Sequence, residues 1–313
     1  MTRARAYGAL AALIALTAGS ACLAAPPADI PIAASHIYPE SLSAGADGTL
    51  YIGSIKGIVF RKLPGETEAS PWITPDASNG ILSLLGVLTD PATNTLWLCS
   101  APNPFRTPPA TGISALKALD LATGALKASY DFPAPAAACN DIAIAPDGTV
   151  FATDTPNGRI LSLKPGDMAL SVFAADPALR GIDGIAFDDV GTLFINNVIA
   201  NTLQRIERGT DGSYAGATTL ILSQPVKGPD GFRLLSGKTF LLAEGPGGRI
   251  DTVTIDGDRA TVTPVKTGLN SSPAVTHFGG VGYALEGKIG YLVDPKLKGQ
   301  DPDPFVIRAF ALE

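Results

Sequence analysis

The sequence has few of the residues that mark the common catalytic and metal centres. Its 313 residues include only two histidines and three cysteines, and no two cysteines form a CxxC pair. The GxSxG, P-loop, HExxH and dinucleotide-binding motifs are all absent. Serine-hydrolase, nucleotide-binding and zinc-protease functions therefore have no support in the sequence.

Positive charge and long apolar runs are also scarce. The chain has 23 basic and 29 acidic residues, a net charge of −6. Loss of Arg3 and Arg5 with a predicted leader changes this to 21 − 29 = −8. Such a charge argues against binding to nucleic acid or to an anionic membrane surface. No stretch beyond the leader approaches the roughly 20 apolar residues of a membrane span, so none is predicted.

Residues 1–25 have the features of an export signal, with two arginines, an apolar run and then small residues. We predict that this segment is cleaved, that residues 26–313 form one domain, and that the mature protein is periplasmic or secreted. Cys22 offers an alternative end to the leader, since bacterial lipoproteins carry a lipid anchor on a cysteine at such a place. The leucine usual three residues before that cysteine is missing here.

Ordinary cleavage leaves two cysteines, Cys99 and Cys139, in neighbouring repeats of the pattern described next. A disulfide between them and two small buried thiols are both consistent with export.

The dominant pattern is a repeat in which a short apolar strand turns at Gly or Asn and returns as a second strand. The turn markers are 46, 54, 43, 46 and 43 residues apart. A period in the forties with alternating apolar residues is typical of four-stranded propeller blades, and no helical run of usable length interrupts it. We therefore predict an all-β, six-bladed β-propeller, with its markers at Gly48, Asn94, Gly148, Gly191, Gly237 and Gly280.

The last blade has two candidate closing strands. Residues 305–312 are apolar enough to be its outer strand, and residues 30–37 are an alternative from the other end of the chain. Either strand would cover an exposed sheet edge.

Superposing the repeats places mostly polar residues at one position at the start of the first strand of each blade. The first strands line the central channel of a propeller, so one position in every blade forms a ring. Three buried carboxylates cannot all stay ionised close together without a cation or protonation, which predicts a divalent metal site in the channel. The ring is predicted to comprise Glu40, Gly86, Asn140, Asp183, Asp230 and Ser272.

The predicted metal ligands are the four oxygen-bearing residues Glu40, Asn140, Asp183 and Asp230. Because all the ligand atoms are oxygens, Ca²⁺ is favoured, with Mg²⁺ or Mn²⁺ as alternatives.

A second ring lies fourteen residues after the first, at the end of each second strand. One interpretation is that these residues orient the metal ligands; the other is that strand ends meet solvent and are polar for that reason. The ring comprises Ser54, Ser100, Asp154, Asn197, Glu244 and Glu286, with Ser54, Asp154, Asn197 and Glu244 as the expected supports.

Four tripeptides in order at blade-length spacing resemble the regucalcin and gluconolactonase-like propellers and, more distantly, the paraoxonases: Pro39-Glu40-Ser41, Cys139-Asn140-Asp141, Ile182-Asp183-Gly184 and Pro229-Asp230-Gly231. The resemblance covers residues 37–255. It implies that Glu40, Asp183 and Asp230 hold a divalent metal, that Asn140 contacts the metal or substrate, and that Asp230 is also the general base in lactone hydrolysis.

The chain departs from this family at three places. Asp183 stands where the family has Asn, Leu85-Gly86 stand where paraoxonases have a catalytic His, and Ala138 stands where sugar-lactone hydrolases often have Arg. A His-dyad mechanism is therefore excluded, and a polar sugar lactone loses an anchor.

The leading hypothesis is an exported, metal-dependent hydrolase of lactones or related esters, in which Asp230 and Asn140 are catalytic. Phe105, Asp141 and Ser272 are expected in the substrate pocket. The alternative is a non-catalytic, secreted, calcium-binding propeller that serves as an interaction module. A lyase of the strictosidine-synthase type is a third, weaker hypothesis.

Overall fold

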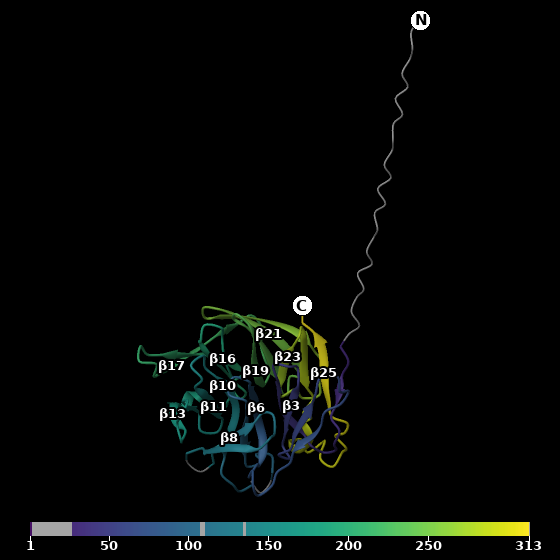
Figure 1. The fold of residues 1–313 in the computed structure, drawn as a ribbon. Helices are drawn as coiled ribbons and strands as arrows, with labels where there is room; N and C mark the ends of the chain where they lie inside the picture. Colours follow the sequence, from purple (N-terminus) through teal and green to yellow (C-terminus); the bar gives the residue numbers. More distant parts are fainter. Residues whose placement is uncertain (2–26, 107–109, 134–135, 313) are drawn as a thin grey trace.

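A computed structural model of the chain describes Met1 and residues 27–106, 110–133 and 136–312. Six antiparallel sheets are arranged around a central channel, which confirms the predicted all-β, six-bladed propeller (Figure 1). The predicted leader and Cys22 lie among residues 2–26, outside the described residues. No helix of the described part is long and apolar enough to cross a membrane.

The first three blades each follow the chain outward from the channel. Blade one contains β2 (Pro39–Ala44), β3 (Leu50–Ser54), β4 (Val59–Lys62) and β5 (Ser70–Ile73). Blade two contains β6 (Ser83–Asp90), β7 (Thr95–Ala101), β8 (Ala115–Asp120) and β9 (Leu126–Asp131). Blade three contains β10 (Cys139–Ile144), β11 (Val150–Asp154), β12 (Arg159–Leu163) and β13 (Ser171–Ala175).

The next two blades repeat this order, and a short 3₁₀ helix, η1 (Pro177–Leu179), precedes blade four. Blade four contains β14 (Ile182–Phe187), β15 (Leu193–Asn197), β16 (Thr202–Arg208) and β17 (Tyr214–Thr219). Blade five contains β19 (Pro229–Ser236), β20 (Thr239–Glu244), β21 (Arg249–Asp256) and β22 (Arg259–Lys266), with β18 (Ile221–Leu222) parallel to β22 at its outer edge.

Both ends of the chain build blade six. From the channel outward its strands are β23 (Val275–Phe278), β24 (Val281–Leu285), β25 (Val306–Ala311) and β1 (Ile30–Pro31). The two candidate closing strands are thus used together, β25 third and β1 outermost. This arrangement joins the termini by main-chain hydrogen bonds and covers a sheet edge.

The hairpin turns use backbone conformations that favour glycine. Gly48, Gly148 and Gly191 each have φ near +84°, in the left-handed region. Buried apolar residues of adjoining blades pack between the sheets and form separate clusters around the propeller.

A disulfide links Cys99 on β7 to Cys139 on β10, so of the two alternatives for these cysteines the structure has the bridge. It ties blade two to blade three near the start of the inner strands.

Two connections between second and third strands are much longer than the others. In blades one, three, four and five this connection is a short turn, whereas residues 102–114 make it in blade two and residues 286–305 in blade six. The second insertion includes the short helix α1 (Gly290–Val293). The described residues of both insertions lie at the end of the channel where the inner strands begin.

Candidate functional site

Four of the predicted ring residues form the floor of one cavity. Glu40, Asn140, Asp183 and Asp230 all line a hollow of about 790 Å³ at the end of the channel where the inner strands begin. Glu40, Asn140 and Asp183 are each more than nine-tenths buried, whereas Asp230 is half-buried. The rotational repeat therefore brings together residues that are up to 190 positions apart along the chain.

A β-bulge aims these side chains into the channel. The pairing register between the first and second strands shifts at the ring position in blades one to five, for example between Cys139 and Ile142 and between Ile182 and Ile185. Bulges of this kind bend the strand and redirect a side chain, and they recur beside functional sites.

The structure corrects the ring at two blades. In blade two the register shift lies between Leu84 and Gly86, so Leu85 takes the ring position and lines the cavity. The hairpin of that blade is one residue longer than in blades one, three and four. Counting eight residues back from the turn therefore reached Gly86 instead of Leu85. In blade six Ser272 is completely buried and does not line the cavity, whereas its neighbours Ser271 and Pro273 do.

Gly86 has a packing role instead. A Cβ atom at this position would lie 2.2 Å from the carbonyl oxygen of Asn140, so a larger residue would push the inner strand of blade three away. Gly184 approaches the carbonyl of Asp230 in the same way, with a built Cβ at 2.3 Å. Glycine thus lets neighbouring inner strands come close enough for their ring residues to converge.

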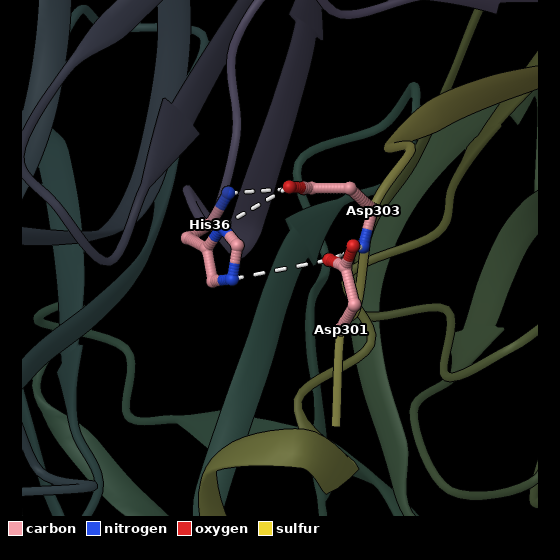
Figure 2. Close-up of side chains that lie close together, drawn as sticks. All are labelled: His36, Asp301 and Asp303. Carbon is pink, nitrogen blue, oxygen red and sulfur yellow. Dashed lines mark hydrogen bonds and ion pairs between the residues drawn. The ribbon is translucent and has the colours of Figure 1, made fainter. Parts of the chain in front are cut away.

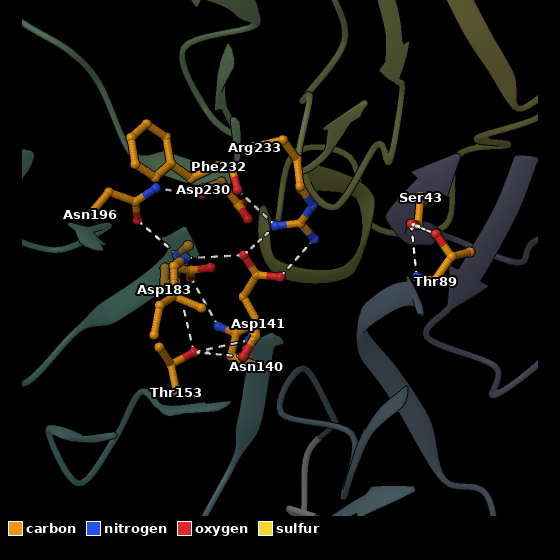
Figure 3. A network of polar contacts seen from close by, with 12 residues as sticks. Ser43, Thr89, Asn140, Asp141, Thr153, Asp183, Asn196, Asp230, Phe232 and Arg233 are labelled. Carbon is orange, nitrogen blue, oxygen red and sulfur yellow. Dashed lines mark hydrogen bonds and ion pairs between the residues drawn. The ribbon is translucent and has the colours of Figure 1, made fainter. Parts of the chain in front are cut away.

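Three floor residues from consecutive blades lie close to one another. The Nδ2 atom of Asn140 donates to Asp183 Oδ2 (3.0 Å) and to Thr155 Oγ1 (2.8 Å), as Figure 3 shows for the first contact. Asp230, in the next blade, lies close enough to Asp183 for the charge of Asp183 to raise its pKa. Across the channel, the buried Oε2 atom of Glu40 has no hydrogen-bond partner among the described residues.

These three carboxyls are poorly stabilised as anions. Burial raises the pKa of Glu40 well above its ordinary value, and the charge of Asp183 raises it further. Burial, followed by the charges of Asp183 and Glu40, raises the pKa of Asp230 well above its ordinary value. Burial and the charge of Asp141 raise the pKa of Asp183 to about 7. None of the three has an ion pair in the part of the chain that the structure describes.

Arg233, whose charge also acts on Glu40, is paired with Asp141. Arg233 donates from Nη1 and Nη2 to the two carboxylate oxygens of Asp141, both at 2.7 Å (Figure 3). The backbone N–H of Ile185 also donates to Asp141 Oδ2 (3.1 Å). Asp141, expected in the substrate pocket, therefore does not line it, because its carboxylate turns along the channel to meet the guanidinium.

Two residues that the sequence analysis missed hold the floor backbone in place. Thr153 Oγ1 donates to the carbonyl of Asp183 (2.9 Å), and Asn196 Nδ2 donates to the carbonyl of Asp230. Each bond runs from the second strand of one blade to the ring residue of the next (Figure 3). Both residues stand one position before the second ring when the repeats are superposed. The other four blades have Gly, Cys, Ala and Leu at that position, so it does not form a polar ring.

The second ring does not support the first. Ser54 bonds the backbone of Ile58, and the Asn197 side chain bonds the backbone of residues 180, 199 and 200. Asp154 pairs with Arg159 and accepts from the N–H of Ala138, rather than holding Asn140. These side chains therefore bond backbone groups at the ends of their own blades rather than the ring residues.

The acidic members of the second ring are paired with arginines of their own blades. Glu244 lies 2.8 Å from Arg249, and Glu286 lies 2.8 Å from Arg308. Burial and a hydrogen bond with the carboxyl of Asp251 raise the pKa of Glu244 to about 7.

The histidines lie away from the cavity floor. His36 is exposed, and its Nδ1 and Nε2 atoms lie 3.1 Å from Asp303 and 3.8 Å from Asp301 (Figure 2). These three are the only set of three potential metal-binding side chains within 4.8 Å of one another among the described residues. Glu40, Asp183 and Asp230 do not meet that distance together. His277 Nε2 contacts the carbonyl of Leu234 (3.0 Å).

Phe105 lies where it was expected, in the wall of the cavity above the floor. It belongs to the long insertion of blade two and packs against the first apolar cluster.

A scan of family models and a search of curated proteins each find no match to this sequence. Solved structures do match. A gluconolactonase of Xanthomonas campestris is 15% identical, with a TM-score of 0.64 over 92% of this chain and 99% of its own. A luciferin-regenerating enzyme is 12% identical, with a TM-score of 0.66 over 92% and 96%. A virginiamycin B lyase of Staphylococcus aureus is 14% identical, with a TM-score of 0.57 over 91% and 99%.

At these identities the likeness shows the fold. The structure fits the gluconolactonase-like propellers that the four tripeptides resemble, and enzymes of several chemistries share that fold.

Proposed function

We propose that this chain is a metal-dependent hydrolase of lactones or related esters. One observation carries the proposal: three carboxyls, two of them buried and that of Asp230 half-buried, line the floor of a single cavity with one carboxamide, and none of the three forms an ion pair among the described residues. Leaving such groups without a counter-charge is costly, and active sites are where this cost is found.

The donor set fits a hard divalent ion. Glu40, Asp183, Asp230 and the amide of Asn140 offer only oxygen ligands, which suits Ca²⁺ first and Mg²⁺ or Mn²⁺ next. The unsatisfied Oε2 of Glu40 is a further sign that the floor is incomplete. Such an ion, when bound, would polarise a substrate carbonyl and stabilise developing negative charge.

The side chains of the floor have separate tasks in this proposal. Asp230 takes a proton from water at a carboxylate oxygen, as a general base positioned on the cavity floor. Asn140 has its Nδ2 atom engaged by Thr155 and Asp183, which fixes the orientation of the amide toward the cavity. Leu85 gives no polar group where a catalytic histidine would stand.

The predicted export signal places this activity in the periplasm or outside the cell. The bridge between Cys99 and Cys139 suits an oxidising compartment.

The test is lactone hydrolysis by the mature chain with and without Ca²⁺, compared with the Asp230→Asn variant. We expect Asp230→Asn to lower kcat/KM about 10²- to 10⁴-fold, the usual contribution of a general base, while circular dichroism stays native. Turnover at the wild-type rate would remove Asp230 from the mechanism. Stabilisation by Ca²⁺ without hydrolysis of any lactone or ester would favour the secreted binding module instead.

A further inference from the structure

We infer that the substrate carries a long apolar substituent. This substituent lies against the cavity wall that the loops form above the floor, and it leaves the cavity between Ile199 and Val293. This inference rests on the proposed function, because it describes the substrate class of the same site. It starts from the contrast between the floor of the cavity and its wall.

The wall above the carboxyls is largely apolar. Leu85, Phe105, Ala138, Val198 and Ile289 line it, together with several prolines. Outside the floor, the polar side chains in the lining are those of Thr155, Arg180 and Ser271. A sugar lactone would bring several hydroxyl groups against this wall and leave them without partners, which costs binding free energy. An alkyl or aryl substituent gains from the same contact.

The two long insertions supply much of this wall. Phe105 comes from residues 102–114 of blade two, and Ile289 and Val293 come from residues 286–305 of blade six. The short turns of the other blades contribute fewer large side chains. Loops that are specific to one chain, on a rigid scaffold, are where substrate selectivity usually resides.

Apolar side chains continue from the wall to the surface. Ile199 is 73% exposed and Val293 is 57% exposed, and both line the cavity. They come from different blades, on the turn after β15 and at the end of α1. Large exposed apolar residues that adjoin an apolar cavity are a feature of ligand-binding mouths, and they extend the path for a chain that leaves the floor.

The volume also favours a substrate larger than a bare lactone ring. Cavities for small molecules span roughly 300–1,000 Å³, so about 790 Å³ lies in the upper half of that range. A five-membered ring at the floor fills a small part of it. The remaining space is bounded by the apolar wall.

The binding test uses 2-alkylcyclopentanones, which keep a ring and a carbonyl but have no ester bond to cleave. Their affinity for the mature chain with Ca²⁺ is measured by calorimetry from ethyl to octyl. We expect the affinity to rise up to about fourfold per methylene group, the equivalent of ~0.8 kcal/mol for each buried CH₂. An affinity that does not change with chain length overturns the inference.

The variant test compares the cavity mouth, at Ile199 of blade four and Val293 of blade six, with the opposite end of blade four. In the Ile199→Ser, Val293→Ser double variant, affinity should rise less with chain length. The ratio of the octyl affinity to the ethyl affinity should fall at least severalfold. Val190→Ser is the matched control, because Val190 is 78% exposed on the same blade but lies in the turn at the opposite end of the channel. An equal effect of Val190→Ser would overturn the inference.

Hydrolysis of 4-alkyl-γ-lactones separates this inference from the proposed function. If kcat/KM rises with chain length, both stand. If short polar lactones are cleaved as well as long ones, the function stands and the apolar substituent is refuted. If alkylcyclopentanones bind with the expected dependence but no lactone or ester is cleaved, the apolar ligand class stands and the hydrolase fails.

Discussion

Two sets of buried acids lie at the same end of this propeller and differ in what neutralises them. At the ends of the second strands, Asp154, Glu244 and Glu286 each pair with an arginine of their own blade. At the starts of the first strands, Glu40, Asp183 and Asp230 have no such partner among the described residues and have raised pKa values. Both sets follow the same repeat, so the spacing alone does not separate a structural acid from a functional one.

This difference between paired and unpaired acids shows that equivalent polar positions of a repeat can have either a structural or a functional role. An acid whose arginine lies a few residues away is satisfied within one blade and stabilises a turn. At the floor, Glu40, Asp183 and Asp230 lie near acids of other blades, so like charges gather and their pKa values rise. The following variants test this distinction.

The largest effect on stability is expected where an axial acid does have an arginine. Arg233→Met leaves Asp141 buried without its cation, and it should lower the free energy of unfolding by ~3–5 kcal/mol in urea denaturation. The Arg233→Met, Asp141→Leu double variant should recover most of that loss, since both charges are then gone. If the double variant is as unstable as Arg233→Met, the ion pair is not the cause.

The next largest loss of stability is expected at an acid of the second ring. Asp154→Ala removes the partner of Arg159 and of the Ala138 N–H, and we expect a loss of ~2–3 kcal/mol in thermal unfolding. By contrast, Asp183→Asn should cost nothing without metal, because it removes a charge from a crowded floor. A greater loss for Asp183→Asn than for Asp154→Ala would reverse the comparison.

The pH dependence sharpens the contrast further. The folded carboxyl of Asp183 keeps its proton up to about pH 7, whereas its ordinary value is 3.8, so the folded state binds more protons between these values. The stabilisation is therefore complete below about pH 4 and is lost as the pH rises through 7. Relative to Asp183→Asn, the metal-free wild type should lose on the order of 4 kcal/mol across this range.

Melting temperatures of the two proteins at pH 4 to 8, with a chelator, measure this difference. Adding Ca²⁺ at pH 8 should restore the wild type more than the variant. If the melting temperatures of the two proteins changed in parallel with pH, burial and neighbouring charges would not raise the pKa of Asp183.

The smallest effect is expected at a neutral member of the second ring. Ser54→Ala removes hydrogen bonds to the backbone of Ile58 and should cost ~0.5–1.5 kcal/mol, with lactone turnover unchanged. A large fall in turnover with native stability would show that the second ring supports the site after all.

Much of the fold and part of the site could be predicted from the repeat. The period of the turns predicted six blades, and counting from each turn found Glu40, Asn140, Asp183 and Asp230 on one cavity floor. The count failed in blade two because one hairpin is a residue longer, which put Leu85 rather than Gly86 on the ring.

Contacts between blades were beyond such a count. Asp141 is paired with Arg233, which lies 92 residues away and is not indicated by the repeat. The apolar wall and its mouth likewise depend on two insertions that the repeat does not describe.

The amino-acid sequence by itself determined the number of blades and most of the residues at each blade position, since alternation, turn glycines and a regular period act over a few residues at a time. Only the tertiary structure decided which acids acquire a cation. That choice depends on the distance between side chains of different blades, and it was set by bulges, by glycines that let inner strands approach, and by the reach of a single arginine along the channel.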